Sequence, residues 1–476
     1  MTKLEDSVPD NTVEAEIICG LVKRSRKAME EFSNAGQEQV DTAVTALAWS
    51  IYKLERAREL AELAVKDTGL GNVVSKIQKN QRKTFGALRD LKRVKSVGII
   101  DNDTKKGIIK YAKPVGVVAA VCPSTNPAAT PVNKAMFAVK GKNGVIIAPS
   151  PSGLSTTTKT VDYMRMELDR IGVSPDLVQV LPAPVNKILT QELMEQSDLV
   201  VVTGSQNNVR RAYSSGTPAI GVGAGNVTVI IDDSADLKDA AMKICQSKTF
   251  DNSTSCSAES QLIIMDSVYE AAIAALKKVG GYLCNNEEKE QLRDNLWVNG
   301  KLNRHIIAKD PKILAEICNF SEKAITSKFF MVEDKTPGPG NLFSDEKLSL
   351  ALTIYKAQNL TDAIDQANQI MNVCGHGHSI GIHTQSAEHA ELLAERMEVV
   401  RVLVNQAHTY GNGGGFNNGL NFTLSMGCGT WGGNSISENL NYQHFINITH
   451  LVNTIPEDKP SESELFGDYW EIYGKE

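Results

Sequence analysis

The segment Val115-Gly-Val-Val-Ala-Ala-Val-Cys-Pro-Ser-Thr-Asn-Pro127 joins a short apolar run to a polar loop. Similar runs rich in valine and isoleucine recur downstream, separated by stretches of helical length: Val145–Ala148, Leu177–Leu181, Leu199–Thr203 and Val227–Ile231. Runs that are apolar on both faces are typical of strands in a parallel sheet covered by helices. The sequence therefore predicts an α/β fold, with the polar loop at the carboxyl end of the first strand, where such folds bind ligands.

Helical periodicity precedes this sheet, and a second α/β series follows it. Apolar residues at three- and four-residue steps predict helices over 13–32 and from 40 to Gly69, a glycine suited to end a helix. After Asp232-Asp233 and a helix over 237–247, the next expected strands are Gln261–Met265, Leu350–Tyr355, Ser379–His383 and Arg401–Val404. We therefore expect two α/β domains with a boundary near residues 232–236.

Composition and charge exclude several classes of protein. The chain has 476 residues, of which 42% are hydrophobic and 22% charged, and its net charge of −6 argues against a nucleic-acid partner. Eight cysteines are spread singly without a CxxC pair, as expected of reduced thiols in the cytoplasm. The N-terminal MTKLEDSVPD lacks the apolar stretch of a signal peptide. The longest segment without charged residues, Val402–Ser437, is too rich in glycine and asparagine to span a membrane.

Three polar tracts lie where α/β folds place their chemistry. The amide of Asn126 could donate to an oxyanion, and the alternative is an Asx turn before proline. The glycines of Gly221–Gly225 allow the backbone to approach a flat or phosphorylated ligand, and no carboxylate occurs between Asp198 and Asp232 to serve as a base. Cys256 stands among small polar residues, so it is either an inert thiol or a nucleophile. It is a better nucleophile candidate than the cysteines in apolar patterns, Cys122, Cys245 and Cys318.

Taken in order, these tracts resemble the CoA-acylating branch of the aldehyde dehydrogenase superfamily, including the aldehyde dehydrogenase half of bifunctional aldehyde–alcohol dehydrogenases. The resemblance covers nearly the whole chain and is carried by Ser75–Asn80, Pro123–Pro127, Ala212–Gly216, Gly221–Asn226, Ser247–Asn252, Glu346–Ser349 and Gly427–Asn439. The last of these, Gly-Cys-Gly-Thr-Trp-Gly-Gly-Asn-Ser-Ile-Ser-Glu-Asn, is long and of unusual composition. The resemblance implies an NAD(P)-dependent enzyme that converts an aldehyde and coenzyme A into an acyl-CoA.

The resemblance also assigns roles to individual residues. Cys256 aligns with the catalytic cysteine of the family, and Asn126 with the asparagine that holds the oxyanion. The implied cofactor-binding residues are Thr125, Pro149, Ser150, Ser152, Thr203, Gly204, Gly223, Gly225 and Glu346. Hydrolytic relatives carry a glutamate where this chain has Gly221-Val222. Its absence implies that water lacks a base in this loop, and that coenzyme A discharges a thioester on Cys256.

Two departures from the family pattern bear on the ligands. Residues 144–161 contain no acid but many hydroxyls, which favours NADP, with NAD also accepted, unless the hydroxyls merely cap the next helix. In the tract 405–419, asparagines replace an aspartate found in relatives that act on neutral aldehydes. Its glycine run could form an anion nest. The residues expected to contact the substrate are His408, Tyr410, Asn412 and Phe250.

In sequence and composition, the tract 405–419 resembles that of acylating sulfoacetaldehyde dehydrogenases, so an anionic aldehyde, sulfoacetaldehyde, is the expected substrate. The alternative is a small neutral aldehyde such as acetaldehyde, bound beside Phe250 and Phe416. Rival interpretations of the whole chain are a hydrolytic aldehyde dehydrogenase and a catalytically silent binding protein with the same fold. Apart from Cys374, no carboxylate or cysteine joins the histidines His376, His378 and His383 at helical spacing, and no metal site is expected.

The architecture that the resemblance implies has three parts. A Rossmann-type cofactor domain takes residues 1–94 and 114–232, and an α/β catalytic domain takes 233–434. A small β-structured oligomerisation element takes 95–113 and 435–476, in which a hairpin over Lys95–Lys113 joins the stretch around Phe445–Val452. Exposed strands need pairing, so a homodimer or homotetramer is expected.

Overall fold

Four helices open the described part of the chain, which is residues 13–476 of a computed structural model: α1 (Val13–Glu31), α2 (Gln37–Tyr52), α3 (Leu54–Thr68) and α4 (Val73–Lys92). The first twelve residues, including the MTKLEDSVPD segment, lie outside the described residues. The predicted helix from 40 to Gly69 is divided at Lys53, whose extended backbone separates α2 from α3. Gly69 ends α3 with a φ of 66°, as the sequence predicted.

The first sheet is parallel and has five strands in the order β5-β4-β3-β6-β7. The strands are β3 (Val117–Val121), β4 (Gly144–Ala148), β5 (Val178–Val180), β6 (Leu199–Thr203) and β7 (Ala219–Val222). The helices that connect them are α5 (Ala129–Lys140), α6 (Leu154–Arg170), α7 (Lys187–Gln196) and α8 (Gln206–Tyr213). Alternate residues of β3 pack against α2 and α5 on one face and against α1 and α7 on the other. Both faces are therefore apolar, as the sequence predicted.

The second sheet is also parallel and has seven strands in the order β10-β13-β14-β9-β8-β15-β16. The strands are β8 (Val227–Ile231), β9 (Glu259–Met265), β10 (Gly281–Leu283), β13 (Phe329–Glu333), β14 (Ala351–Ala357), β15 (Ile380–His383) and β16 (Val402–Val404). Its helices are α9 (Leu237–Thr249), α10 (Tyr269–Lys278), α11 (Asn286–Leu296), α12 (Pro311–Ile317), α13 (Glu322–Ile325), α14 (Leu360–Met371), α15 (Ala387–Arg396) and α16 (His408–Gly411). A two-stranded ribbon, β11 (Trp297–Val298) and β12 (Lys301–Leu302), completes this domain.

The predicted domain boundary is wrong by one strand. β8 pairs with β9 and β15 in the second sheet, so the chain leaves the first domain at residues 223–226 and not at 232–236. The predicted end of the second domain also shifts, because Phe422 is buried in the core of the first domain. The segment that follows α16 therefore returns to the first domain well before residue 434.

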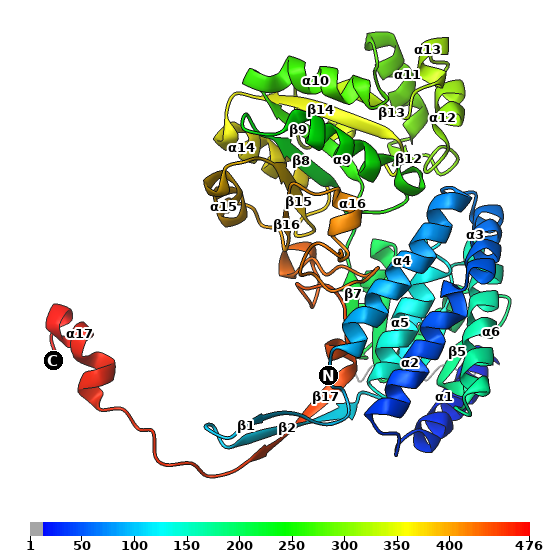
Figure 1. The fold of residues 1–476 in the computed structure, drawn as a ribbon, viewed down its shortest axis with the longest axis vertical. Coiled ribbons are helices and arrows are strands. Elements are labelled where there is room, and N and C mark those ends of the chain that lie inside the picture. The colour runs from blue at the N-terminus through cyan, green and yellow to red at the C-terminus, as the bar shows by residue number, and fades with distance from the viewer. Residues whose placement is uncertain (1–12) are drawn as a thin grey trace, which may run out of the picture.

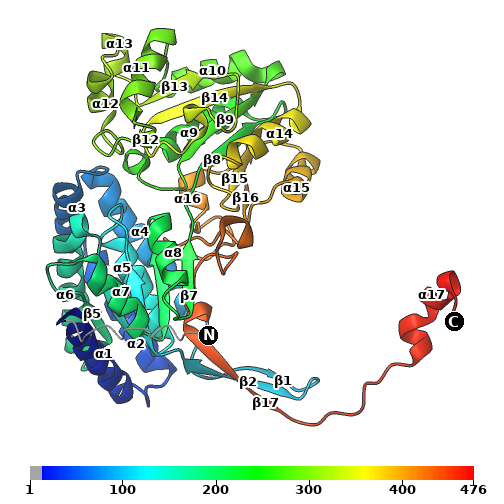
Figure 2. The ribbon, with the colours of Figure 1, turned by 180° about the vertical axis from the view of Figure 1, so that it is seen from behind.

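A third, antiparallel sheet stands off the two domains in Figures 1 and 2. It contains β1 (Gly98–Asp103), β2 (Ile108–Pro114) and β17 (Ile446–Val452), and β17 pairs with β2 along its whole length. The predicted pairing of the Lys95–Lys113 hairpin with the stretch around Phe445–Val452 is confirmed. An extended arm leads from β17 to a final helix, α17 (Glu462–Tyr473), which lies away from the rest of the chain. None of the helices formed by residues 13–476 combines the length and apolarity that a bilayer crossing requires.

One buried side chain, Asn143, joins the projecting sheet to the first domain. Its Oδ1 accepts from the backbone N–H groups of Val115 at 2.7 Å and Gly116 at 3.0 Å, where β2 leads into β3. Its Nδ2 donates to the carbonyls of Ala138 at 2.9 Å and Phe445 at 2.7 Å, the latter just before β17. The start of β3, the end of α5 and the start of β17 are thus fixed by one amide.

Replacing Asn143 with alanine should destabilise the protein by about 3 kcal/mol, because buried backbone donors and acceptors would lose their partner. The free energy of unfolding in denaturant measures this. Asn447→Ala is the matched control, since it removes an exposed amide with only a 3.5 Å contact to the Pro114 carbonyl and should change the stability by less than about 0.5 kcal/mol. Equal losses in the two variants would contradict the role given to Asn143.

Candidate active site

A cavity of about 330 Å³ lies between the two α/β domains. The first domain contributes loops at the carboxyl ends of β3, β6 and β7, and the second contributes the segment before β9 and the loop that carries Glu346. Helix α4 forms a further wall through Lys79, Arg82 and Lys83. The predicted site residues that line the cavity are Thr125, Asn126, Thr203, Gly204, Gly223, Phe250, Cys256, Glu346 and Tyr410. The remaining predicted residues, Pro149, Ser150, Ser152, Gly225, His408 and Asn412, do not line it.

Cys256 faces this cavity from the segment between α9 and β9. Desolvation raises the pKa of its thiol to about 12, and the negative charges of Glu346 and Cys428 act in the same direction. Gly225 packs directly behind Cys256, since a Cβ on Gly225 would lie 2.0 Å from the Cys256 carbonyl oxygen. Gly225 is therefore needed for close packing of the segment between β7 and β8 against Cys256. It was predicted to contact the cofactor, but it lies behind the cysteine and does not line the cavity.

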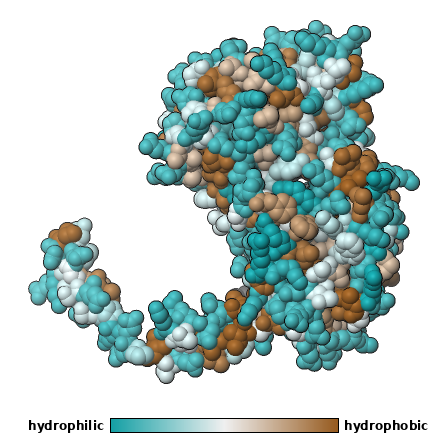
Figure 3. All heavy atoms as spheres, in the orientation of Figure 1, coloured by the Kyte–Doolittle hydropathy of each residue, from teal (hydrophilic) through white to brown (hydrophobic). Residues whose placement is uncertain are grey.

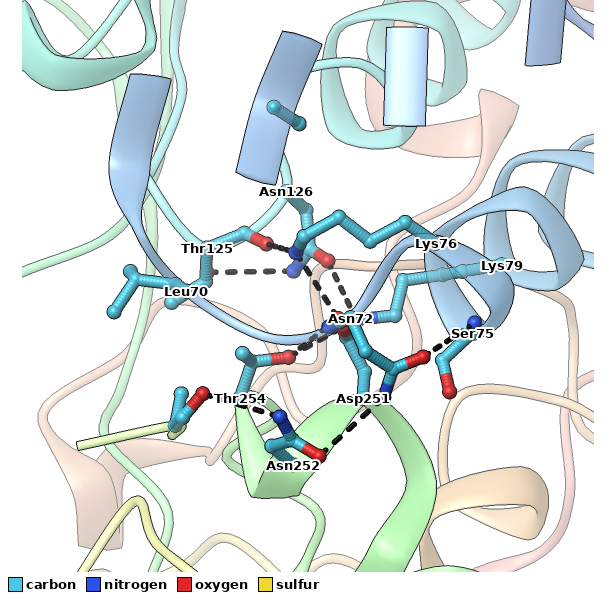
Figure 4. Close-up of polar contacts among 12 residues, drawn as sticks. Leu70, Asn72, Ser75, Lys76, Lys79, Thr125, Asn126, Asp251, Asn252 and Thr254 are labelled. Carbon is cyan, nitrogen blue, oxygen red and sulfur yellow. Dashed lines mark hydrogen bonds and ion pairs between the residues drawn. The ribbon is translucent and has the colours of Figure 1, made fainter. Parts of the chain in front are cut away.

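The turn before Cys256 is held by a buried carboxylate, Asp251, which Figure 4 shows at the centre of the contacts. Asp251, Asn252 and Ser253 all have positive φ values, of 52°, 52° and 61°, a conformation that costs energy in residues other than glycine. Asp251 accepts hydrogen bonds from Lys76 and Lys79 of α4 and from the backbone N–H of Asn72. These contacts lower the pKa of Asp251 despite its burial, and they stabilise the turn.

Asn126 is oriented by the same network. Lys79 donates from Nζ to Asn126 Oδ1 at 2.8 Å, and Lys76 donates to the Thr125 carbonyl at 3.1 Å. Because the amide oxygen is occupied, the amide nitrogen of Asn126 is the group that remains to donate, and its one contact is a 3.3 Å hydrogen bond to Thr125 Oγ1. The cavity thus contains a thiol and an oriented amide donor from different domains.

The residues expected to hold a nicotinamide dinucleotide fit that ligand. Glu346 lines the cavity with a buried Oε1 that has no hydrogen-bond partner, and burial raises its pKa to about 8. Thr203 and Gly204 end β6 next to the central strand, and Ser150, after β4, also has a buried hydroxyl without a partner. Unpartnered polar groups at the carboxyl edge of a parallel sheet suit the hydroxyls of a dinucleotide.

A carboxylate from another part of the chain contacts the hydroxyl-rich segment that follows the Pro149–Ser152 turn. Asp67, at the end of α3, accepts hydrogen bonds from Ser155 Oγ at 2.6 Å and from the backbone and hydroxyl of Thr156 at the start of α6. Two of the hydroxyls that favoured NADP therefore donate to a carboxylate that is distant in the sequence.

His408 and Asn412 support the cysteine segment and do not face the substrate cavity. His408 is buried, its Nδ1 lies 3.0 Å from the Ser257 carbonyl, and desolvation lowers its pKa to about 3. Asn412 donates to Ser257 Oγ at 2.9 Å and accepts from Arg401 at 2.7 Å. The expected anion nest is also wrong for two of its N–H groups, since those of Gly414 and Gly415 already donate to Gly411 and Asn418.

Three cations of α4 that line the cavity were not predicted from the sequence. Lys79, Arg82 and Lys83 are spaced i, i+3, i+4, which places them on one face of a helix. That spacing was visible, but a basic helix face is usually exposed to solvent, and nothing in the residue types indicates burial.

Of the histidines considered for a metal, His376 contacts Glu398 and His378 contacts Ser379. Within residues 13–476, one other group has suitable ligand atoms close together, namely Asp232, Asp233 and His389. Both Asp232 oxygens there already accept hydrogen bonds, one from Ser234 and one from the ring of His389.

Comparison with known proteins agrees with this geometry. The model of the aldehyde dehydrogenase family matches residues 11–283. The chain is 49% identical to an acylating sulfoacetaldehyde dehydrogenase of Cupriavidus necator, over 97% of this chain and 94% of that protein. It is 44% identical to another of Bilophila wadsworthia, over 95% and 98%. The crystal structure of an acetylating aldehyde dehydrogenase from Geobacillus thermoglucosidasius has a TM-score of 0.90 and 33% identity, covering 95% of this chain and 100% of that one.

The raised pKa of Cys256 predicts how its reactivity depends on pH. A thiol with a pKa of about 12 is protonated at neutral pH, and its thiolate fraction grows about tenfold per pH unit up to that value. Alkylation of Cys256 by iodoacetamide in the ligand-free protein, followed on its peptide by mass spectrometry, should therefore keep rising through pH 10. A plateau near pH 8.5, as for an ordinary cysteine, would contradict this environment.

Proposed function

The chain belongs to the acylating branch of the aldehyde dehydrogenase family, and on this basis we propose that it oxidises sulfoacetaldehyde with NAD(P)⁺ and coenzyme A to sulfoacetyl-CoA. The observation that carries the proposal is that Cys256 and the oriented Asn126 amide line one cavity, while the segment Val222–Ala224 brings no acid to it. The alternative substrate is a small neutral aldehyde such as acetaldehyde.

The chain's own residues account for the covalent steps. Cys256 loses its thiol proton to solvent, and the thiolate adds to the aldehyde carbon. The oxyanion that forms accepts hydrogen bonds from the Asn126 amide and the Cys256 backbone N–H. Glu346, Thr203, Gly204 and Ser150 would hold a nicotinamide dinucleotide, which would supply the acceptor for the hydride of this carbon. Cys256 is then left as a thioester.

Discharge of the thioester requires a second nucleophile. Among the described residues that line the cavity, Glu346 is the one carboxylate, and it is assigned to the cofactor. Water therefore lacks a dedicated base, whereas the thiol of coenzyme A ionises far more readily than water and can displace Cys256 directly. The products are an acyl-CoA and the free Cys256 thiol, and the exchange of one thioester for another makes the step reversible.

Two features support the proposed location and oligomeric state. All eight cysteines are free thiols, which suits the cytoplasm. β17 is an edge strand whose exposed apolar residues include Ile448, Leu451 and Val452, and apolar side chains are visible along the projecting sheet in Figure 3. Such an edge favours pairing with another copy, so we propose a homodimer or homotetramer.

The test of the proposed function is the rate of nicotinamide reduction, with sulfoacetaldehyde or acetaldehyde, with and without coenzyme A, and with NADP⁺ or NAD⁺. We expect reduction to depend on coenzyme A, Cys256→Ala to abolish it, and Asn126→Ala to lower kcat by about 10²–10³, the usual cost of one oxyanion donor. Acid formation without coenzyme A would indicate a hydrolytic enzyme instead. Inactivity with every aldehyde would indicate a binding protein.

A further inference from the structure

Two of the cations that line the cavity, Arg82 and Lys83, have no carboxylate partner within residues 13–476. Arg82 donates to the Tyr410 carbonyl at 3.0 Å, and its guanidinium lies 5.0 Å from the centre of the Tyr410 ring and 5.2 Å from that of Phe422. Lys83 is buried and donates to the Gly413 carbonyl at 2.6 Å. Neutral carbonyls and aromatic rings are thus the contacts that hold these two positive charges.

Three other cations of α4 are paired, and Lys92 at its end is exposed to solvent. Lys76 and Lys79 contact Asp251, and Arg89, two turns after Arg82, contacts the adjacent Asp90 at 2.7 Å. Burial of a cation without a counter-charge is costly, and proteins usually avoid it by pairing the charge. Arg82 and Lys83 thus differ from Lys76, Lys79 and Arg89 in lining the cavity or its surroundings without a carboxylate partner.

The electrostatics of Lys83 agree with a missing counter-charge. Desolvation, followed by the positive charges of Arg82 and Lys79, holds the pKa of Lys83 well below its usual value. A negative charge on Cys256 acts in the opposite direction, so the amine and the thiol are close enough to interact. An anion bound beside Lys83 would stabilise its ammonium form, and that anion would lie near the nucleophile.

We propose that Arg82 and Lys83 form an anion subsite that binds the terminal sulfonate of a short aldehyde and so positions its carbonyl carbon at Cys256. The proposal rests on the proposed function and assigns the charged end of its substrate. The planar guanidinium and the ammonium are both strong donors for an oxyanion, and a sulfonate offers three acceptor oxygens. The rings of Phe250 and Tyr410, with centres 4.8 Å apart, line the same cavity.

Coenzyme A also carries anionic groups, but they are remote from its thiol. The thiol must reach Cys256 inside a cavity of about 330 Å³, and the pantetheine arm then carries the phosphates away from it. The subsite beside Cys256 is therefore assigned to the aldehyde, and measurement of the KM for coenzyme A tests that choice.

The first experiment compares Arg82→Gln and Lys83→Gln with the wild type on two aldehydes. Loss of one partner from a buried charge pair predicts that the ratio of kcat/KM for sulfoacetaldehyde to that for acetaldehyde falls about 30-fold in each variant, mainly through the KM for sulfoacetaldehyde. Arg82→Lys, which keeps the charge, should recover part of the ratio. The matched control is Arg89→Gln, on the same helix and near the same Phe422 ring but outside the cavity, which should leave the ratio unchanged.

Three results would overturn the subsite: an unchanged ratio in both variants, an equal loss with both aldehydes, or a rise in the KM for coenzyme A in place of that for sulfoacetaldehyde.

A second measurement does not depend on turnover. Isethionate, an unreactive two-carbon sulfonate, should protect Cys256 of the wild type from iodoacetamide at least tenfold better than it protects the Lys83→Gln variant. Equal protection, or none, would also overturn it. Should the wild type oxidise acetaldehyde but not sulfoacetaldehyde, the proposed substrate fails, while protection by isethionate still decides whether the anion subsite exists.

Discussion

The buried carboxylate of Asp251 is the interaction on which the rest of the site depends. It stands in a turn of three residues with positive φ and accepts from Lys76 and Lys79 of α4. Through Lys79 it is linked to Asn126 of the first domain, and the same turn leads directly to Cys256 of the second. Removing one partner from such a buried pair typically costs about 3–5 kcal/mol, so the network holds the donor and the nucleophile in a defined relation across the domain boundary.

Helix α4 has two electrostatic functions in this account. Its paired lysines fix the geometry of the protein, and its unpaired Arg82 leaves positive charge in the cavity, to which Lys83 adds when an anion stabilises its ammonium form. Glu346, the one lining carboxyl among the described residues, has a pKa of about 8 and is largely protonated at neutral pH. The electrostatics of the cavity therefore favour an anionic ligand. The proposed sulfonate would supply the negative charge that Arg82 and Lys83 lack.

Much of the fold could be predicted from local sequence, because strands buried on both faces are continuous apolar runs, as in Val117–Val121. The sheet to which Val227–Ile231 belongs could not, since an apolar run looks the same in either sheet and pairing is decided by distant strands. Cys256 and Asn126 were visible as polar residues in loops at strand ends. The position of His408 and Asn412 behind the cavity wall could not be predicted, because residue type does not tell a cavity wall from the layer behind it. Arg82 and Lys83 were missed for the converse reason, since a basic helix gives no sign that one face is buried.

In the proposed mechanism, the thioester on Cys256 persists until a thiol attacks it, because none of the described residues that line the cavity is available as a general base for water. The most direct test is the lifetime of the acyl-enzyme, formed with NAD(P)⁺ and labelled aldehyde in the absence of coenzyme A and followed by mass spectrometry of the Cys256 peptide. We expect the thioester to persist over many turnover times and to disappear within one turnover when coenzyme A is added. Decay to the free acid at the same rate with and without coenzyme A would contradict it.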